Sequence, residues 1–231
     1  MRKQFTEITG PGGIEGNESV NDPIWALGWD YKSVILACRE PEKGWTFYRL
    51  PKASFAYDGA HGWNTEWPRI RNVGTKENPD YLMTMHGMFW RFPQTFTSAN
   101  TAGITPRGAY LKVIADFANW NGRLVFGCDD SAQSEFLNKR KQKGNIGGPG
   151  QSHSNIWFGD MSTPDNVGPT TAGGSIWLKE DIKAGVASEP FLFNGWDNRC
   201  AWIANRSNKP AVITFEVDKK GDNKWSELRK V

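Results

Sequence analysis

The chain contains few of the residues that build metal centres and disulfide frameworks. It has 231 residues, of which three are cysteine and three are histidine. Cys38, Cys128 and Cys200 lie far apart and form no Cys-x-x-Cys pair, which argues against a zinc knuckle and against a dense disulfide framework. Each cysteine lies at the edge of a predicted strand, so we expect all three to pack in a core.

The sequence also lacks the features of membrane and nucleic-acid-binding proteins. Charged residues make up 23% of it and the mean hydropathy is −0.59, values that exclude membrane spans and wholesale disorder. Its amino terminus has no apolar stretch of the kind found in a secretion signal. The net charge is only +3, so no basic face is concentrated enough to indicate a nucleic-acid partner.

Several catalytic motifs are missing as well. The sequence contains no Gly-x-Ser-x-Gly elbow, no phosphate-binding loop ending in Gly-Lys-Ser/Thr, no dinucleotide fingerprint and no His-Glu-x-x-His. The sequence therefore contains none of the patterns that usually indicate nucleotide chemistry or serine hydrolysis.

Aromatic residues and chain-breaking residues are abundant. The chain has 12 Trp, 25 Gly and 13 Pro, and its aromatic content is 13%. Short apolar runs separated by Gly and Pro are typical of many short strands joined by turns. The composition predicts an all-β protein.

A turn leading into an apolar run recurs along the chain. Gly28-Trp29-Asp30 precedes residues 34–37, and Gly195-Trp196-Asp197 precedes residues 201–204. Trp120-Asn121-Gly122 leads into an apolar run in the same manner. Such recurrence at long intervals indicates a repeat architecture.

The predicted strands form four pairs, three of which follow a further short strand. The pairs are 33–39 with 45–51, 81–85 with 88–93, 123–130 with 154–160, and 200–206 with 211–218; the additional strands lie within 68–73, 109–117 and 190–195. This arrangement favours a single β-propeller domain over residues 1–231, with about four to five blades visible. The chain would be either a short ring or a fragment of a larger propeller, and a β-sandwich is the alternative.

The segment 131–150 interrupts this rhythm. It combines a basic cluster with several glycines, so we interpret it as an insertion loop. It is either a solvated surface loop or a lid over a site.

All three histidines lie at predicted turns or strand edges. His61, His86 and His153 are flanked by Gly or Ser, and Gln151 lies two residues before His153. Imidazoles with an amide oxygen suit a divalent metal such as manganese or zinc. The alternatives are carbohydrate contacts without metal and three unrelated polar turns.

The segment 57–69 concentrates the most chemistry. It contains His61, Trp63, Glu66, Trp67 and Arg69, and in a propeller it would lead into the strand nearest the central axis. Indole faces stack on sugars while carboxylates and guanidinium groups bind hydroxyls. The alternative is structural, with both tryptophans wedged between blades and Arg69 paired with Glu66.

Weaker candidates follow in other connections. Arg107 lies in a polar connection expected at the same rim, and Asp129 with Asp130 leaves a predicted strand. Adjacent strand residues point to opposite faces, so at most one of these aspartates faces a site. Residues 218–225 have the composition of a calcium loop without its ligand spacing, and we interpret them as a hairpin turn.

Several motifs carry a resemblance to large bacterial extracellular β-propeller proteins. They are GPGGI, GWD, RLPKAS, HGWNTEWPRIR, HGMFW, NTAGI, SNIWFG, and KAGV followed by PFLF, and together they resemble the C-terminal blades of those proteins. The resemblance implies a propeller fold and an extracellular or periplasmic setting related to glycans. The architecture is similar to that of propeller polysaccharide lyases, one group of which binds manganese through histidines and a glutamine.

The resulting hypothesis is a propeller that interacts with a carbohydrate or polysaccharide at its central channel. As a polysaccharide lyase or glycosidase, it would place His61, Glu66 and Arg69 at the reacting bond. Substrate contacts would come from Trp63, Trp67, Arg107 and Asp129, and a divalent metal (Mn, Zn or Ca) from His86, Gln151 and His153. The alternative is a non-catalytic carbohydrate-binding or protein-interaction scaffold.

Overall fold

The computed structural model describes residues 4–53, 67–129 and 154–231. These residues form antiparallel sheets, which confirms the all-β class. The helices in these ranges are the 3-10 turns η1 (Gly13–Glu15) and η2 (Thr163–Asp165), and none is long and apolar enough to cross a membrane. The predicted insertion loop at 131–150 lies outside the described residues.

Three sheets follow one another along the chain, each with its strands in sequence order. Sheet 1 contains β1 (Gln4–Thr9), β2 (Ile24–Trp29), β3 (Val34–Glu40) and β4 (Gly44–Leu50). Sheet 2 contains β5 (Arg69–Asn72), β6 (Tyr81–Met85), β7 (Met88–Phe92) and β8 (Thr105–Ala109). Sheet 3 contains β9 (Val113–Trp120), β10 (Arg123–Asp129) and β11 (Ser154–Asp160).

Sheet 2 is buried on both faces. The alternate residues Tyr81, Met83 and Trp90 pack against sheet 1 in one core, whereas Leu82 and Phe89 pack against sheet 3 in a second core. Successive strand residues point to opposite faces, so the apolar run in β6 supplies both cores. The three sheets are therefore stacked face to face.

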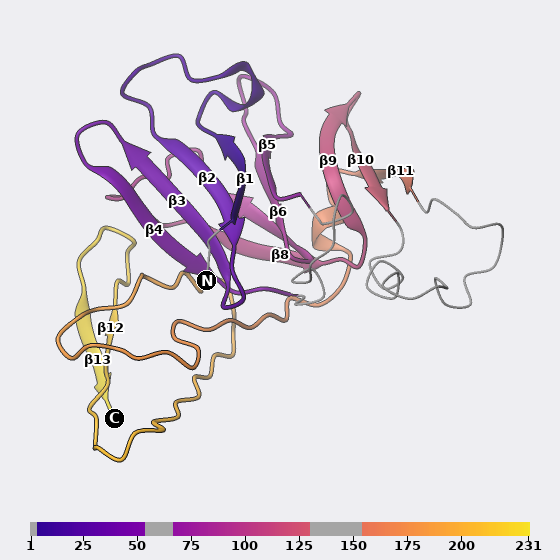
Figure 1. Cartoon of the computed structure of the whole chain (residues 1–231). Coiled ribbons are helices and arrows are strands. Elements are labelled where there is room, and N and C mark those ends of the chain that lie inside the picture. The colour runs from indigo at the N-terminus through magenta and orange to yellow at the C-terminus, as the bar shows by residue number, and fades with distance from the viewer. Residues whose placement is uncertain (1–3, 54–66, 130–153) are drawn as a thin grey trace, which may run out of the picture.

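The first strands of the three sheets lie together. Each of β1, β5 and β9 is an edge strand of its sheet, and β5 contacts both of the others. Figure 1 shows β5 between β1 and β9 along one side of the stack. Side chains from three separate sheets can therefore meet at this edge.

Two turns predicted from the sequence have the backbone of tight hairpins. His86 and Gly87 join β6 to β7, and Asn121 and Gly122 join β9 to β10. All four residues have positive φ angles of 46°, 79°, 51° and 76° in that order, the combination that a two-residue type I′ turn needs.

The chain after η2 is mostly extended and exposed. Its strands are β12 (Thr214–Val217) and β13 (Ser226–Lys230), which form a separate hairpin. Figure 1 shows this part running beneath sheets 2 and 1 to that hairpin. At the turn, the Asp218 carboxylate accepts backbone hydrogen bonds from Lys220, Gly221 and Asn223, so the hairpin interpretation of residues 218–225 is confirmed.

Some local predictions were wrong. Residues 200–206 form no strand, and Trp202 there is 86% exposed; residues 190–195 contribute a single bridge, from Phe191 to Arg49. An apolar run becomes a strand only where another strand pairs with it, and the described neighbours supply no such partner. Cys38 and Cys128 are buried as expected, but Cys200 is exposed because it lies in this unpaired stretch.

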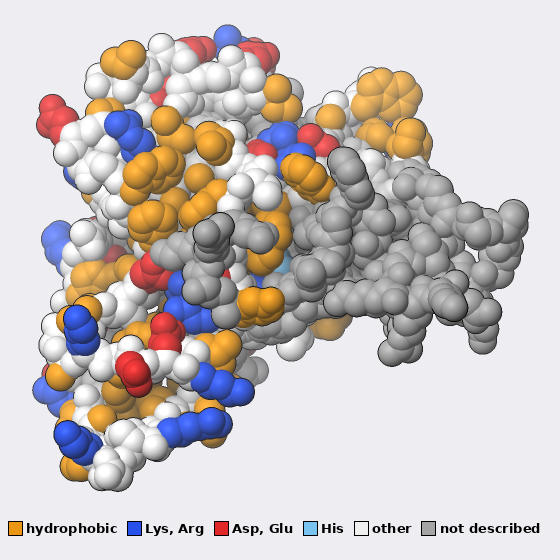
Figure 2. Space-filling model, in the orientation of Figure 1, with side chains coloured by type: hydrophobic (Ala, Val, Ile, Leu, Met, Phe, Trp, Pro, Cys, Tyr) orange, Lys and Arg blue, Asp and Glu red, His pale blue; other side chains and the backbone are white. Residues whose placement is uncertain are grey.

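Exposed apolar side chains remain on both outer faces of the stack. Phe5 and Ile8 lie on the face of sheet 1 that points away from sheet 2, and Ile156 and Phe158 lie on the corresponding face of sheet 3. Figure 2 shows hydrophobic side chains spread over the outer face of sheet 1. Large exposed apolar faces mark surfaces on which other elements pack.

Candidate functional site

The strongest concentration of charge lies where β1, β5 and β9 meet. Glu7 of β1, Arg69 and Arg71 of β5, and Asp116 of β9 form a connected group that we call the edge cluster. Arg69 and Arg71 are two residues apart, so both point to the same face of β5. Ile70 between them points the other way, into the core against sheet 1.

Each guanidinium group contacts both carboxylates. Arg69 Nη1 lies 3.4 Å from Glu7 Oε2, and Arg69 Nε lies 3.3 Å from Asp116 Oδ2. Arg71 Nη1 donates to Glu7 Oε1, and Arg71 Nε and Nη2 each lie 3.2 Å from an Asp116 oxygen. The four side chains therefore form an alternating arrangement of charges that connects three sheets.

A β-bulge precedes each of the two carboxylates. The pairing of β1 with β2 shifts between Phe5 and Glu7, which leaves Thr6 as the extra residue. The pairing of β9 with β10 shifts so that Ala115, directly before Asp116, is the extra residue. A bulge changes which face the following side chains reach, and here it brings the carboxylates to the two arginines.

The carboxylates differ in exposure. The Glu7 side chain is 6% exposed and the Asp116 side chain is 52% exposed. Burial raises the pKa of the Glu7 carboxyl above its ordinary value, an effect that the charges of Arg71 and Arg69 and the Arg71 hydrogen bond oppose. Asp116 is the member of the cluster most open to solvent.

Trp67 lies beside the cluster. Its backbone N–H donates to the carbonyl of Ile114 in β9 (3.2 Å), and the Arg69 guanidinium lies over its ring, 5.5 Å from the centroid. Trp67 is 41% exposed, so a partly exposed aromatic ring is held against Arg69 of the edge cluster.

Buried polar atoms without a hydrogen-bond partner also gather here. Among the described residues they include Arg69 Nε and Arg71 Nε, whose contacts with Asp116 are ion pairs and not hydrogen bonds, and the hydroxyls of Thr6 and Thr84. Thr6 precedes Glu7, and Thr84 is paired with Arg69 across β5 and β6, which puts both side chains on one face. Buried hydroxyls of this kind are normally satisfied by ordered water or by a ligand.

Of the site residues predicted from sequence, Arg69 and Trp67 come together. Others lie elsewhere. Arg107, expected in a connection, lies in β8 at the opposite edge of sheet 2, where it forms two hydrogen bonds with Asp165, the last residue of η2 (2.8 and 2.6 Å). His86 is buried in its turn, with its ring 5.4 Å from that of Trp29.

Six further candidate residues were predicted from the sequence. His61, Trp63, Glu66, Gln151 and His153 lie outside the described residues. Asp129 is the last residue of β10, paired with Val113 and Ser154. Within residues 4–53, 67–129 and 154–231, no group of three or more His, Cys, Asp or Glu side chains could hold a metal ion.

Sequence reasoning missed Glu7, Arg71 and Asp116. The two-residue spacing of Arg69 and Arg71 was a usable signal, because it places both guanidinium groups on one strand face. The carboxylates had no comparable signal, since their positions depend on two bulges and on the stacking of three sheets.

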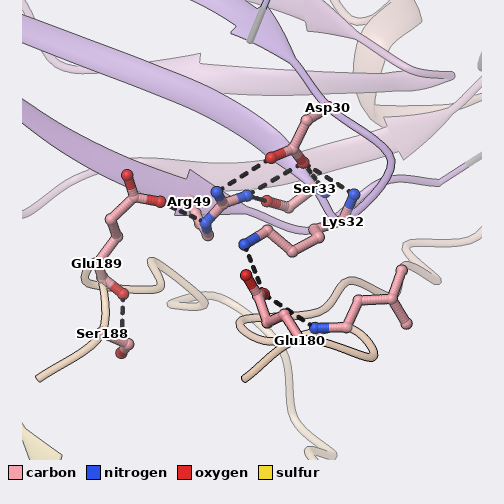
Figure 3. A network of polar contacts seen from close by, with 8 residues as sticks. Asp30, Lys32, Ser33, Arg49, Glu180, Ser188 and Glu189 are labelled. Atoms are coloured by element: carbon pink, nitrogen blue, oxygen red, sulfur yellow. Dashed lines mark hydrogen bonds and ion pairs between the residues drawn. The ribbon is translucent and has the colours of Figure 1, made fainter. Parts of the chain in front are cut away.

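A second charged network lies at the opposite side of sheet 1. Arg49 at the end of β4 is 2% exposed and donates to both Asp30 oxygens (3.1 and 3.0 Å) and to Ser33 Oγ (2.7 Å). Its Nε lies 2.6 Å from Glu189, and Lys32 binds Glu180 at 2.9 Å. Figure 3 shows Arg49 between Asp30 and Glu189, with Lys32 reaching Glu180.

This network fastens the strap, which we define as residues 173–192, to sheet 1. Backbone hydrogen bonds connect Lys52 with Gly173, Ser175 with Lys32, and Arg49 with Pro190 and Leu192. The Arg49 guanidinium is fully engaged by protein oxygens, so the network is structural. It explains the first Gly-Trp-Asp segment, in which Gly28 and Trp29 end β2 and the Asp30 carboxylate accepts the N–H groups of Lys32 and Ser33. The second copy, at 195–197, does not lead into a strand.

The network predicts a pH dependence of stability. Burial opposes ionisation of Asp30. The hydrogen bonds and charge of Arg49, together with the N–H groups of Ser33 and Lys32, outweigh the effect of burial and lower the pKa of Asp30 below its ordinary value of 3.8. A carboxyl whose pKa is lower in the folded state than in the unfolded state stabilises the protein fully at pH values above the unfolded-state pKa. This stabilisation is lost as the pH falls through the folded-state pKa.

We therefore expect Asp30→Asn to be much less stable than the unmodified protein at pH 6, with the difference shrinking below about pH 3.8. Urea unfolding between pH 3 and pH 6 measures it. Asp197→Asn, which changes an exposed carboxyl, is the matched control and should show no such trend. A difference for Asp30→Asn that stays constant with pH would contradict the role of the ion pair.

No protein-family model matches the chain, and searches of curated proteins and of solved structures find no significant match. The geometry of the edge cluster is therefore the basis for the function proposed below.

Proposed function

We propose that the chain is a glycan-interacting β-propeller, or a portion of one, and that sugars bind at the edge cluster beside Trp67. Stacked antiparallel sheets, each in strand order, are the arrangement of propeller blades around a central channel. Sheet 2 is covered on both faces, unlike either sheet of a two-layer sandwich. The exposed apolar outer faces of sheets 1 and 3 are where further blades would pack.

The observation that carries this proposal is an exposed indole next to a mixed group of carboxylates and guanidinium groups from three sheets. A sugar ring has an apolar face that stacks on indole and a rim of hydroxyls that both donate and accept hydrogen bonds. Asp116 accepts from hydroxyls, whereas Arg69 and Arg71 donate to them. The first strands of successive blades border the channel, the usual position of propeller sites.

Glycoside hydrolysis is a second candidate function, favoured by the contrast between the two carboxyls. Glycosidases use a carboxylic acid with a raised pKa and an ionised carboxylate in a more polar environment. Burial raises the pKa of Glu7, and Asp116 is the more exposed of the two. Hydrolysis would require Glu7 to carry a proton, so that Asp116 alone balances Arg69 and Arg71, and it would use Asp116 as the ionised partner.

The binding proposal is tested with Trp67→Ala. We expect this variant to bind soluble polysaccharides about tenfold more weakly, roughly 1.4 kcal/mol, because it removes the stacking surface. Affinity electrophoresis on gels containing neutral or acidic polysaccharides measures the change. Reducing-sugar release from the same polymers, and ultraviolet absorbance of unsaturated products, report hydrolysis and elimination.

Trp45→Ala is the matched control. Trp45 is 46% exposed, which is similar to the 41% of Trp67. It lies in β4, at the edge of sheet 1 opposite β1. It should bind as the unmodified protein does. The proposal fails if the unmodified protein is retarded by none of the polymers, or if the two tryptophan variants behave alike.

A further inference from the structure

The positive and negative charges within the edge cluster balance each other. Two guanidinium groups and two carboxylates are present, and each guanidinium contacts both carboxylates. A site built for anionic sugars keeps at least one arginine available to pair with the ligand carboxylate. Here Arg71 alone makes two contacts with Asp116 and one with Glu7.

The group that faces solvent is a carboxylate. The Asp116 side chain is 52% exposed, whereas those of Arg69 and Arg71 are 15% and 12% exposed. An approaching ligand therefore meets an anionic acceptor before it reaches either cation. A uronate would have to displace Asp116 from Arg69 and Arg71, or bind with two carboxylates close together, and both arrangements are unfavourable.

From this geometry we infer that the edge cluster selects neutral glycans over uronic-acid polymers. The inference rests on the proposed function and specifies its ligand class. A neutral sugar donates hydroxyl hydrogen bonds to the exposed side of Asp116 without disturbing its ion pairs, and its ring stacks on Trp67. Elimination requires a uronate carboxyl beside the proton that is removed, so this ligand class fits binding or hydrolysis and not a lyase reaction.

The test is calorimetric titration with neutral hexasaccharides of glucose, mannose and xylose, and with hexagalacturonate and hexamannuronate. We expect at least one neutral ligand to bind at least tenfold more tightly than either uronate. Asp116→Lys should reverse this order, because it replaces the exposed anion with a cation. Asp116→Asn should weaken neutral binding without creating uronate binding.

Asp165→Asn is the matched control, because Asp165 is similarly exposed (47%) and is also held by an arginine, far from the edge cluster. It should retain the affinity and order of the unmodified protein. Thermal melts confirm that each variant is folded. Tighter binding of a uronate that Trp67→Ala abolishes would overturn this inference and leave the proposed function standing. Failure of all five ligands to bind would overturn both.

Discussion

Arg49→Ala is expected to lower the free energy of unfolding by about 3–5 kcal/mol, since removing one partner of a buried ion pair leaves the other charge buried without compensation. The Asp30 side chain is 5% exposed and receives two hydrogen bonds from Arg49. The variant would also lose the contacts to Ser33 and Glu189. Urea unfolding followed by tryptophan fluorescence measures the loss.

Two further variants test whether the loss of stability comes from the buried ion pair. Arg39→Ala removes an exposed arginine from the adjacent strand β3 and should cost less than about 1 kcal/mol. The double variant Asp30→Asn with Arg49→Met removes both charges and keeps an apolar stem, so it should recover a substantial part of the stability. If Arg49→Ala and Arg39→Ala cost the same, the network does not stabilise sheet 1.

The same network couples the strap to the sheet. Glu189 belongs to the strap, and residues 190–192 run beside Arg49 in the parallel direction. Limited proteolysis should therefore cut the strap faster in Arg49→Ala than in the unmodified protein, because the loss of Arg49 releases its fastening.

Local sequence signals predicted two of the tight turns well. His86-Gly87 and Asn121-Gly122 determine their turns through positive φ angles, which Gly adopts freely and which Asn and His adopt more often than most other residues. The strands on either side have apolar residues on one or both faces, so their existence followed from hydrophobicity alone. The third strand pair was also predicted from hydrophobicity, and its residues 154–160 form β11.

Long-range arrangement was much less predictable. The strands β1 and β2 were missed because glycines and short polar runs surround them. β2 becomes a strand by pairing with β3, and β1 by pairing with β2. Residues 200–206 show the converse, since an apolar run without a partner stays unpaired. Propensity describes a segment, whereas a sheet depends on its neighbours.

In the candidate site, too, the residues identified by local sequence were predictable and those brought in by long-range packing were not. Arg69 and Trp67 were identified from the local crowding of charged and aromatic residues in 57–69. Glu7 lies 62 residues before Arg69, and only the packing of sheet 1 on sheet 2 brings them together. Arg69 was expected to pair with Glu66 in the structural alternative; within the described residues it pairs with Glu7 and Asp116.

Phe89→Ala is expected to destabilise the protein by about 3–5 kcal/mol, the usual cost of removing a buried phenylalanine ring. Phe89 is 0% exposed at the centre of the core between sheets 2 and 3. Its ring lies 4.5 Å from that of Tyr110, 5.5 Å from that of Phe126 and 6.4 Å from that of Trp157. The cavity would therefore be lined by both sheets and could not close without shifting one against the other.

Phe158→Ala is the matched control, because Phe158 lies on the outer face of sheet 3 and is 46% exposed. It should cost less than about 1.5 kcal/mol, and denaturant unfolding compares the two. The Phe89 variant should in addition bind glycan more weakly at temperatures where it stays folded, because Arg71 on sheet 2 and Asp116 on sheet 3 meet only while these sheets stay stacked. Equal losses of stability in the two variants would contradict the three-layer stack, and with it the argument that one edge of the stack assembles the site.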